Sequence, residues 1–219
     1  MNNLKKLFKE NKYFLIPYFL LVVLSIILLS SFSKTELHIA SNKANSAFFD
    51  VFFKYATSFG NGWMIAILFL GLLMLRYRFA FAFLTGSLIT SLIVNVLKKL
   101  IFHDVYRPLK YFEQYSTYKL HLVEGVNMHL LQSFPSGHSA TAFNVFFTLA
   151  ILVKSNTLKF IFLIMALLVA YSRVYLSQHF LVDITVGSII GICGIIFSFI
   201  WFSNMKASWL NGSVMHRNE

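Results

Sequence analysis

The chain is poor in charged residues and nearly devoid of cysteine. Charged residues make up 12% of its 219 residues, about half the share found in water-soluble domains. Hydrophobic residues make up 58%, in long apolar runs separated by short charged patches, a pattern typical of polytopic membrane proteins. The single cysteine, Cys193, lies inside an apolar run, which excludes an internal disulfide and a cluster of thiolate metal ligands.

Acidic residues are especially scarce. Eight Asp and Glu oppose 19 Lys and Arg, which gives a formal net charge of +11. Many of the cations stand in short loops beside apolar runs, where membrane orientation and anionic lipid headgroups both favour them. The charge therefore indicates a lipid bilayer as the partner and not a nucleic acid.

Six apolar segments approach the length of about 20 residues that a bilayer-crossing helix needs. The second and the fourth are short, and we expect them to extend into their weakly polar flanks. We predict an all-α fold, a bundle of six transmembrane helices in a single domain over residues 1–219. The six segments are 13–32, 61–75, 79–97, 139–153, 158–175 and 182–202.

Short basic loops of a membrane protein lie on its cytoplasmic side. With six crossings, four basic groups share one side, so both termini are predicted to be cytoplasmic in a cell (inner) membrane protein. The longer segments, 33–60, 98–138 and 172–183, then face the periplasm or exterior. The middle one is also basic, and we attribute its cations to ligand binding. The four cytoplasmic groups are Lys5, Lys6, Lys9 and Lys12; Arg76 and Arg78; Lys154 and Lys159; and Lys206 with Arg217.

The first long non-cytoplasmic loop contains a predicted helix at residues 47–56. Its four phenylalanines share a face at helical spacing, and Asp50 and Lys54 stand four residues apart. These features predict an interfacial helix that lies on the bilayer.

Three stretches on the non-cytoplasmic side hold ionisable residues, which are costly near a membrane and tend to be functional there. All three lie next to predicted helix ends. They are Lys99 to Arg107-Pro108, then Pro135-Ser136-Gly137-His138, then Ser172-Arg173 followed by His179 and Asp183.

Five residues of these stretches suit a phosphate group. Lys99, Arg107 and Arg173 have no acidic surplus beside them, and the planar guanidinium groups match phosphate geometry. Ser136 and Gly137 open a predicted helix, where backbone N–H groups and the helix dipole favour an anion. Glycine also lets the backbone approach a ligand closely.

The other three residues suit phosphoryl transfer. His179 and Asp183 are four residues apart, one helical turn, so the carboxylate can accept Nδ1–H and leave Nε2 free as a nucleophile. His138 can supply a proton to the leaving oxygen as a general acid. This set of groups predicts a reaction that needs no metal and no other cofactor.

Each stretch has a structural interpretation when it is taken alone. His179 and Asp183 could pair in a helical core, and Arg173 could extend from a helix end towards the interface. The order of the three stretches, their spacings and their shared membrane face together favour a functional site.

The three stretches resemble the signature of the type 2 phosphatidic acid phosphatases, which are related to bacterial non-specific acid phosphatases and vanadium haloperoxidases. The second and third motifs match without exception. In the first, the family has six residues between Lys and Arg, whereas Leu100 occupies that position here and Lys99 leaves seven. Two outcomes are open: either the end of the helix at 79–97 absorbs this difference, or Lys99 binds phosphate weakly.

What the resemblance implies for single residues agrees with their chemistry. It makes His179 similar to the nucleophile, Asp183 to its orienting partner and His138 to the general acid. It places the catalytic core at about residues 79–202. It assigns phosphate binding to the remaining motif residues: Lys99, Arg107, Ser136, Gly137 and Arg173.

We therefore expect a metal-independent phosphatase that hydrolyses a membrane lipid phosphate or pyrophosphate through a phosphohistidine. Candidate substrates are undecaprenyl pyrophosphate, lipid A phosphate, phosphatidylglycerophosphate and phosphatidate. The long, aromatic-rich segment 109–133 is expected to select the headgroup.

A second hypothesis is a non-catalytic transporter of phospholipids or an anion-binding membrane protein. Intact His138, His179 and Asp183 argue against it, because binding alone needs neither a nucleophile nor an acid. Vanadate-dependent peroxidase chemistry is a third hypothesis, which the membrane setting disfavours.

Overall fold

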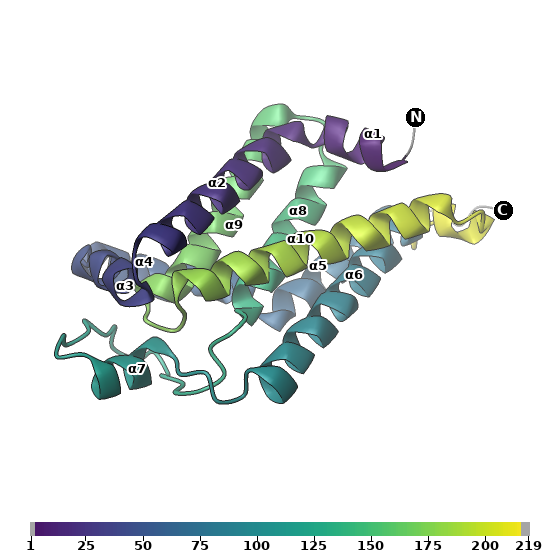
Figure 1. The fold of residues 1–219 in the computed structure, drawn as a ribbon. Coiled ribbons are helices and arrows are strands. Elements are labelled where there is room, and N and C mark those ends of the chain that lie inside the picture. The colour runs from purple at the N-terminus through teal and green to yellow at the C-terminus, as the bar shows by residue number, and fades with distance from the viewer. Residues whose placement is uncertain (1–2, 216–219) are drawn as a thin grey trace.

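The computed structural model describes residues 3–215, and Arg217, one of the predicted cytoplasmic cations, lies outside them. Regular structure in the described residues is helical (Figure 1). In chain order the elements are α1 (Asn3–Glu10), α2 (Lys12–Ser31), α3 (Lys34–Lys43), α4 (Ala47–Ala56), η1 (Thr57–Gly60), α5 (Gly62–Leu75), α6 (Tyr77–Val96), η2 (Leu97–Ile101), α7 (Pro108–Tyr115), α8 (Gly137–Leu152), α9 (Asn156–Tyr175), α10 (Leu181–Asn204) and η3 (Ser208–Asn211).

All six predicted helices form, but fewer than six meet the length and hydropathy of a membrane span. Among the described residues, four helices do so: α2, α6 continued by η2, α9 and α10. The α4–η1 segment and α5 qualify together, with a bend of 55° between them, which brings the number to five. Helix α8 is apolar but has only 16 residues. The molecule is thus an all-α membrane bundle with four to five candidate spans, and the sixth is not established.

Serine side chains fix where four of the helices begin. Ser33, Ser46, Ser136 and Ser155 precede α3, α4, α8 and α9, and each hydroxyl accepts a hydrogen bond from the backbone N–H three residues later. Such a cap satisfies a backbone donor that the first helical turn leaves free. At α8 this cap places Gly137 and His138 in the first turn.

Glycines allow α10 to lie directly against α8. A Cβ atom added to Gly187 would be 2.4 Å from the backbone oxygen of Ser136, and one added to Gly191 would be 2.5 Å from that of Ala140. Small residues permit close helix contacts of this kind in membranes. The Ser136 N–H also donates to the Asp183 carbonyl oxygen at 2.9 Å, so the start of α8 and the first turn of α10 are held together.

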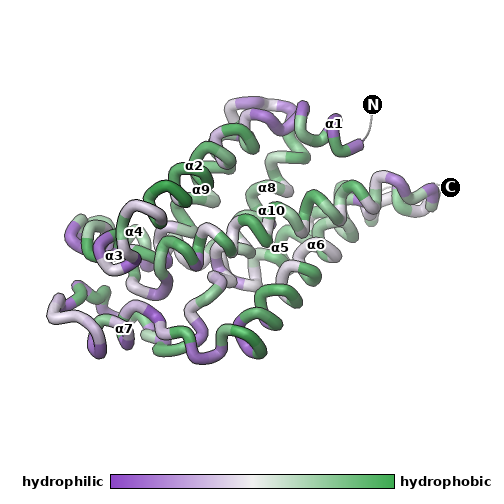
Figure 2. The backbone as a smooth tube through the Cα atoms, viewed as in Figure 1, coloured by the Kyte–Doolittle hydropathy of each residue, from purple (hydrophilic) through white to green (hydrophobic). Residues whose placement is uncertain are grey.

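Apolar residues fill the interior and also cover the outside of the bundle. Phe14, Phe83, Phe143 and Phe147 are each at most 1% exposed in the core. Leu20 on α2 is 65% exposed, and other large apolar side chains of the spans are exposed in the same way. Figure 2 shows this hydrophobic character along most of the helices, with hydrophilic residues gathered at their ends. An apolar outer surface fits a helix bundle whose solvent is lipid.

Hydrogen bonds join the predicted cytoplasmic segments at one end of the bundle. Lys159 donates to the Glu10 carbonyl oxygen and to Asn11 Oδ1, at 2.9 and 2.8 Å. Arg76 donates to Asn211 at 2.7 Å, and Arg78 donates to carbonyl oxygens at the end of α10 and just beyond. Helix α7 and the loops around it lie at the other end, away from both termini (Figure 1).

The helix predicted at 47–56 forms over those residues as α4, but its two charged residues do not pair with each other. Asp50 accepts hydrogen bonds from Tyr175 at 2.6 Å and from His121 at 3.0 Å. Lys54 donates to the Glu124 carbonyl oxygen at 2.7 Å. Helix α4 is thereby fixed to α9 and to the loop after α7, and its place at the bilayer interface stays a prediction.

Candidate active site

The three motif stretches meet where α8 and α10 begin and α9 ends. Arg107 immediately precedes α7, and Arg173 lies in the last turn of α9. His138 is in the first turn of α8, and Asp183 is in the first turn of α10. His179 lies in the tight connection between α9 and α10. The structure thus brings residues from four separate elements to one region.

His179 is 1% exposed, and its Nδ1 lies 3.4 Å from Asp183 Oδ2. Their spacing predicted that the two residues share one helix. They do not, because α10 begins only at Leu181. The connection holds them instead: the His179 N–H donates to the Arg173 carbonyl oxygen at 3.0 Å. The carboxylate also accepts from the Ser133 hydroxyl and, at 2.9 Å, from the Phe180 N–H.

These contacts determine the tautomer of His179. Arg107 Nη1 lies 3.5 Å from His179 Nε2, and a guanidinium group can only donate a hydrogen bond. Nε2 is therefore the acceptor, and Nδ1 carries the proton that faces Asp183. In this tautomer Nε2 carries no proton, so its lone pair can serve either as the acceptor for Arg107 or as a nucleophile.

Neutral oxygen atoms hold the two guanidinium groups in place. Arg107 donates to Gln178 O and Gln178 Oε1, both at 3.2 Å, and to the Leu131 carbonyl oxygen at 2.9 Å. Arg173 donates to Thr57 Oγ1 at 2.7 Å and to Gln178 Oε1 at 3.4 Å. Gln178 therefore bridges the two arginines.

Both guanidinium groups are buried without a counterion. Arg107 is 8% exposed and Arg173 is 7% exposed, and within residues 3–215 neither forms a salt bridge. Arg173 Nε has no hydrogen-bond partner among the described residues. Because an uncompensated buried charge is costly, this arrangement suits a site that binds an anion.

Lys98, and not Lys99, is the lysine that the structure brings to this region. Lys98 Nζ donates to the Gln132 carbonyl oxygen at 3.0 Å, and its charge acts on His179. Lys99, the predicted phosphate ligand, is exposed. The reason is local geometry: α6 continues as a turn of π-helix, η2, and such a turn inserts a residue and shifts the helical register. The helix end thus absorbs the unusual spacing, but with a different lysine than expected.

The electrostatic environment keeps His179 neutral. Burial, followed by the positive charges of Arg107, Arg173 and Lys98, holds the pKa of its imidazole well below 6.5, and a hydrogen bond to the backbone of Ser133 opposes this shift. The side chain is therefore unprotonated at neutral pH. Burial lowers the pKa of Arg107 as well, although Asp183 opposes this; the guanidinium group still carries its charge.

The start of α8 offers backbone donors and an open approach. The Ser136 hydroxyl caps the helix by accepting from the Ser139 N–H at 3.3 Å. A Cβ atom on Gly137 would have only a Val94 methyl group as a neighbour, at 3.8 Å. The backbone at Gly137 is accordingly accessible, and the positive end of the helix dipole points there.

A glycine at the α4–α5 bend positions His138. A Cβ atom on Gly60 would lie 2.9 Å from the His138 carbonyl oxygen and 3.0 Å from its Cβ atom. Only glycine allows η1 to pack this closely on the first turn of α8. The bend is therefore part of the site, although it lies far from the motifs in sequence.

Sequence reasoning missed four residues that shape the site: Ser133, Gln178, Thr57 and Gly60. Gln178 stands among the five unspecified positions of the third motif, and an amide side chain directly before His179 was a usable signal. Ser133 stands two residues before Pro135. Nothing in the sequence pairs Thr57 with Arg173 or Gly60 with His138, because those contacts depend on the bend between α4 and α5.

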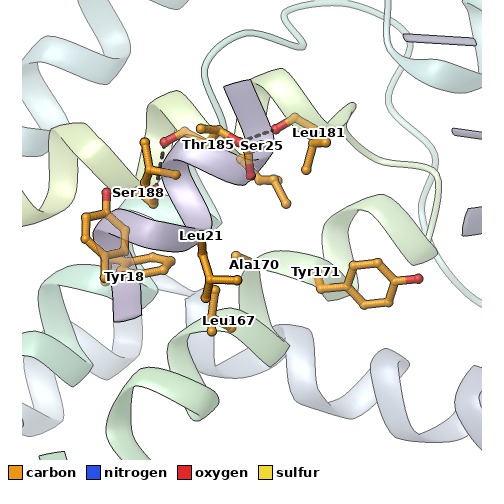
Figure 3. A pocket seen from close by; sticks show the side chains of 12 residues that line it. Tyr18, Leu21, Ser25, Leu167, Ala170, Tyr171, Leu181, Thr185 and Ser188 are labelled. Atoms are coloured by element: carbon orange, nitrogen blue, oxygen red, sulfur yellow. Dashed lines mark hydrogen bonds between the residues drawn. The ribbon is translucent and has the colours of Figure 1, made fainter. Parts of the chain in front are cut away.

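Another cavity in the bundle lacks the groups for this chemistry. Its volume is about 180 Å³, it lies between α2, α9 and α10, and Tyr18 and Ser188 are hydrogen-bonded on its wall at 3.1 Å. Figure 3 shows its lining, which is apolar or uncharged. The described residues also contain no group of three His, Cys, Asp or Glu side chains placed to hold a metal ion. The cations around His179 therefore remain the candidate anion site.

Comparisons with known proteins agree with this geometry. A family model of the PAP2 superfamily matches residues 79–207. The crystal structure of LpxE from Aquifex aeolicus is similar, with 27% identity, coverage of 75% of this chain and 93% of that one, and a TM-score of 0.65.

A second similar structure is a transmembrane PAP2-type phosphatidylglycerolphosphate phosphatase from Bacillus subtilis. It has 21% identity, covers 90% of this chain and 99% of that one, and has a TM-score of 0.61; at this identity the likeness shows the fold alone. A comparison with curated proteins finds no significant match. Because the family model spans more than half of the chain and includes all three motifs, this chain belongs to the PAP2 superfamily of membrane phosphatases.

Proposed function

We propose that the chain, as a single membrane-embedded domain, hydrolyses a membrane lipid phosphate or pyrophosphate through a phosphohistidine on His179. The observation that carries the proposal is a buried, neutral imidazole whose Nε2 faces Arg107 and whose Nδ1 faces Asp183. Binding alone would need the cations but not an oriented nucleophile, so this arrangement favours the enzyme over a transporter or an anion-binding protein.

In the first step the substrate phosphate lies between the guanidinium groups of Arg107 and Arg173, Lys98 and the backbone of Gly137. Nε2 of His179 attacks phosphorus, and the bond between phosphorus and the leaving oxygen breaks. His138, which takes up a proton when the negative charge of the substrate offsets the neighbouring cations, donates that proton to the leaving oxygen, so a monoester leaves as an alcohol and a pyrophosphate leaves as a monophosphate. The positive charge that develops on the imidazole is stabilised by the carboxylate at Nδ1.

In the second step a water molecule attacks the phosphohistidine. His138, now neutral, accepts a proton from that water, and the bond between phosphorus and Nε2 breaks. Inorganic phosphate leaves, and both histidines return to their starting states. The chain's own side chains thus account for every proton transfer, and a reaction without a metal or cofactor stays a prediction.

The substrates expected from the sequence remain the candidates: undecaprenyl pyrophosphate, lipid A phosphate, phosphatidylglycerophosphate and phosphatidate. The likeness to a phosphatidylglycerolphosphate phosphatase is compatible with the third. All four carry the phosphate at the membrane surface while the lipid chain stays in the bilayer. This common feature matches a site at one end of an apolar bundle.

The catalytic role of His179 is tested with purified protein in detergent and a panel of these four lipids. The wild type should release phosphate from at least one of them, and in the presence of EDTA as well. His179→Asn should retain less than about 1% of that activity, because loss of a covalent nucleophile removes several kcal/mol of transition-state stabilisation. His121→Asn, a histidine of the loop after α7, is the matched control and should stay active. Substantial activity of His179→Asn would refute the mechanism.

The two adjacent lysines give a second test. Lys98→Ala should lower kcat/KM by about 10-fold to 100-fold, because one charge-assisted contact to phosphate is lost. Lys99→Ala should change it by less than about twofold, since that side chain is exposed. Rates are measured on the best lipid of the panel. A larger loss in Lys99→Ala than in Lys98→Ala would contradict the register set by η2.

We further propose six membrane crossings in the cell (inner) membrane, with α5 and α8 each counted as one and α4 lying at the bilayer interface. Both termini are then cytoplasmic, and the site faces the periplasm or the exterior. The basic segments that hydrogen bonds join at one end of the bundle support this arrangement, because short basic loops favour the cytoplasm.

The orientation is tested with single cysteines at two serines in a Cys193→Ser background. Ser116→Cys lies after α7, on the side of the motifs, and Ser155→Cys lies between α8 and α9. A membrane-impermeant maleimide applied to intact cells should label the first and not the second, whereas permeabilised cells should label both. The opposite labelling in intact cells would place hydrolysis on the cytoplasmic face.

A further inference from the structure

Two buried polar side chains of α3 face the connection between α9 and α10. His38 is 1% exposed and Asn42 is 2% exposed, and their spacing of four residues puts both on one face of the helix. Helix α3 lies at the end of the bundle that also holds α7 (Figure 1). It contains none of the three motifs and precedes residues 79–207, which the family model matches. The motifs therefore assign no role to these two side chains.

The connection contains a strained turn directly before His179. Ser177 is fully buried and has a φ of 51°, in the left-handed region that residues other than glycine rarely adopt. Its N–H donates to the Val174 carbonyl oxygen at 3.0 Å. The N–H groups of Gln178 and His179 both donate to the Arg173 carbonyl oxygen, at 2.9 and 3.0 Å. The backbone at Ser177 thus sets the directions of the next two side chains, and such a conformation persists only where its surroundings hold it.

His38 makes one contact on each side of the Gln178–His179 pair. Its Nε2 atom is hydrogen-bonded to Ser177 Oγ at 3.1 Å. Its ring packs edge-on against the ring of Phe180, with 5.3 Å between the ring centroids. One side chain from α3 therefore holds both the residue before the pair and the residue after it.

Of the two partners of the Ser177 hydroxyl, His38 is the closer one. Asn42 Nδ2 donates to Ser177 Oγ at the longer distance of 3.5 Å. The same amide group is engaged by the backbone of His121, because Nδ2 donates to its carbonyl oxygen and Oδ1 accepts from its N–H, both at 2.9 Å. Asn42 thus mainly holds the loop after α7, and the turn at Ser177 depends on His38.

Packing alone does not account for a histidine at this position. His38 Nδ1 is buried and has no hydrogen-bond partner among the described residues, and burial of an unpaired polar atom costs free energy. Phe112 and Phe180 lie against the ring, so a phenylalanine would pack there without that cost. Burial lowers the pKa of His38 to about 4, although Asp183 opposes this shift. The neutral ring adds no charge to the site, and its contact to Ser177 is what distinguishes it from an apolar side chain.

We infer that His38 is a positioning residue for the proposed reaction: it holds the turn at Ser177 and the ring of Phe180, and thereby keeps His179 aligned for attack on phosphorus. This inference rests on the proposed function. His38 acts through its neighbours, since no hydrogen bond joins it to His179 within residues 3–215.

The phosphate ligands depend less on this turn than His179 does. Arg107 also donates to the Leu131 carbonyl oxygen, and Arg173 also donates to Thr57 Oγ1. Both acceptors lie outside the connection between α9 and α10. Loss of the His38 contact should therefore slow the chemical step more than it weakens substrate binding.

The test measures kcat and KM of purified His38→Phe protein in detergent, on the lipid of the panel that the wild type hydrolyses best. Phenylalanine keeps the ring packing and removes the contact to Ser177. The value of kcat should fall by about 10-fold to 100-fold, because a misplacement of about 1 Å can cost about 100-fold in rate. KM should change by less than about threefold. His38→Gln, whose amide can bond to Ser177 in place of Nε2, should recover most of the lost kcat.

Tyr175→Phe is the matched control for the loss of a hydrogen bond at this end of α9. It removes the bond of 2.6 Å to Asp50, two residues before the turn, without changing the contacts of Ser177. Its kcat should differ from that of the wild type by less than about twofold. A loss as large as that of His38→Phe would show a general effect of loosening α9 and would contradict the inference.

Ser177→Ala tests whether His38 acts through the turn. Its kcat should fall to a similar extent, and the double variant with His38→Phe should lose no more than the larger single loss, because both changes remove the same contact. Multiplied losses in the double variant, an unchanged kcat in His38→Phe, or a rise in KM alone would each overturn the inference and leave the proposed function intact. If His38→Phe does not fold, an unchanged kcat in Ser177→Ala overturns it. A wild type that releases phosphate from none of the four lipids would instead refute the proposed function, and the inference with it.

Discussion

Two buried guanidinium groups that have no carboxylate partner among residues 3–215 are the constraint around which this end of the bundle is built. Arg107 and Arg173 donate hydrogen bonds to neutral oxygen atoms of Gln178, Thr57 and Leu131. These acceptors do not compensate the positive charge of the two guanidinium groups. That charge, together with burial, keeps His179 neutral. One arrangement thus leaves positive charge uncompensated and keeps the imidazole beside it unprotonated, as the proposed reaction requires.

Asp183 is an acidic group placed within this positive region, and its contacts direct its carboxylate to His179. The Ser133 hydroxyl and the Phe180 N–H fix its carboxylate, which faces His179 Nδ1 and forms no salt bridge with either arginine among the described residues. If it paired with Arg107, it would neutralise the anion site and release the imidazole. The Asp183 carboxylate must therefore lie close enough to orient His179 without forming an ion pair with Arg107.

Backbone geometry at three places brings the charged residues together. Gly187 lets α10 reach Ser136, and Gly60 lets η1 reach His138. The π-helical turn of η2 directs Lys98, in place of its neighbour, to the site. Each place lies at the end or the bend of an apolar helix, where a bundle can be reshaped without exposing backbone to lipid.

Much of this fold could be predicted from the sequence, because apolar length and motif spacing are local properties. The helices, the motif residues and the approach of His179 to Asp183 all follow from such patterns. The lysine could not be predicted, since a π-helical turn gives no signal in composition. The bend between α4 and α5 could not be predicted either, because Asn61 has the pattern of a helix start. A cavity that Asn61 lines forms only where α6 and α8 pack beside it.

The segment 109–133 was expected to select the headgroup from its length and aromatic residues, and that expectation stays a prediction. In the structure its carbonyl oxygens accept hydrogen bonds from Arg107, Gln178 and Lys98. These contacts join residues that are 24 to 51 positions apart in sequence, so no local pattern predicted them.

The most direct test of this account is the detection of phosphate on residue 179 during turnover. His138→Ala protein, which lacks the base of the second step, is mixed with a phosphate ester that has a good leaving group and is quenched in alkali, where phosphohistidine survives. Mass spectrometry of the peptide that contains residue 179 should show a phosphate on His179, and none should appear in the His138→Ala, His179→Asn double variant. Phosphate on another residue, or turnover with no phosphorylated peptide, would contradict the account.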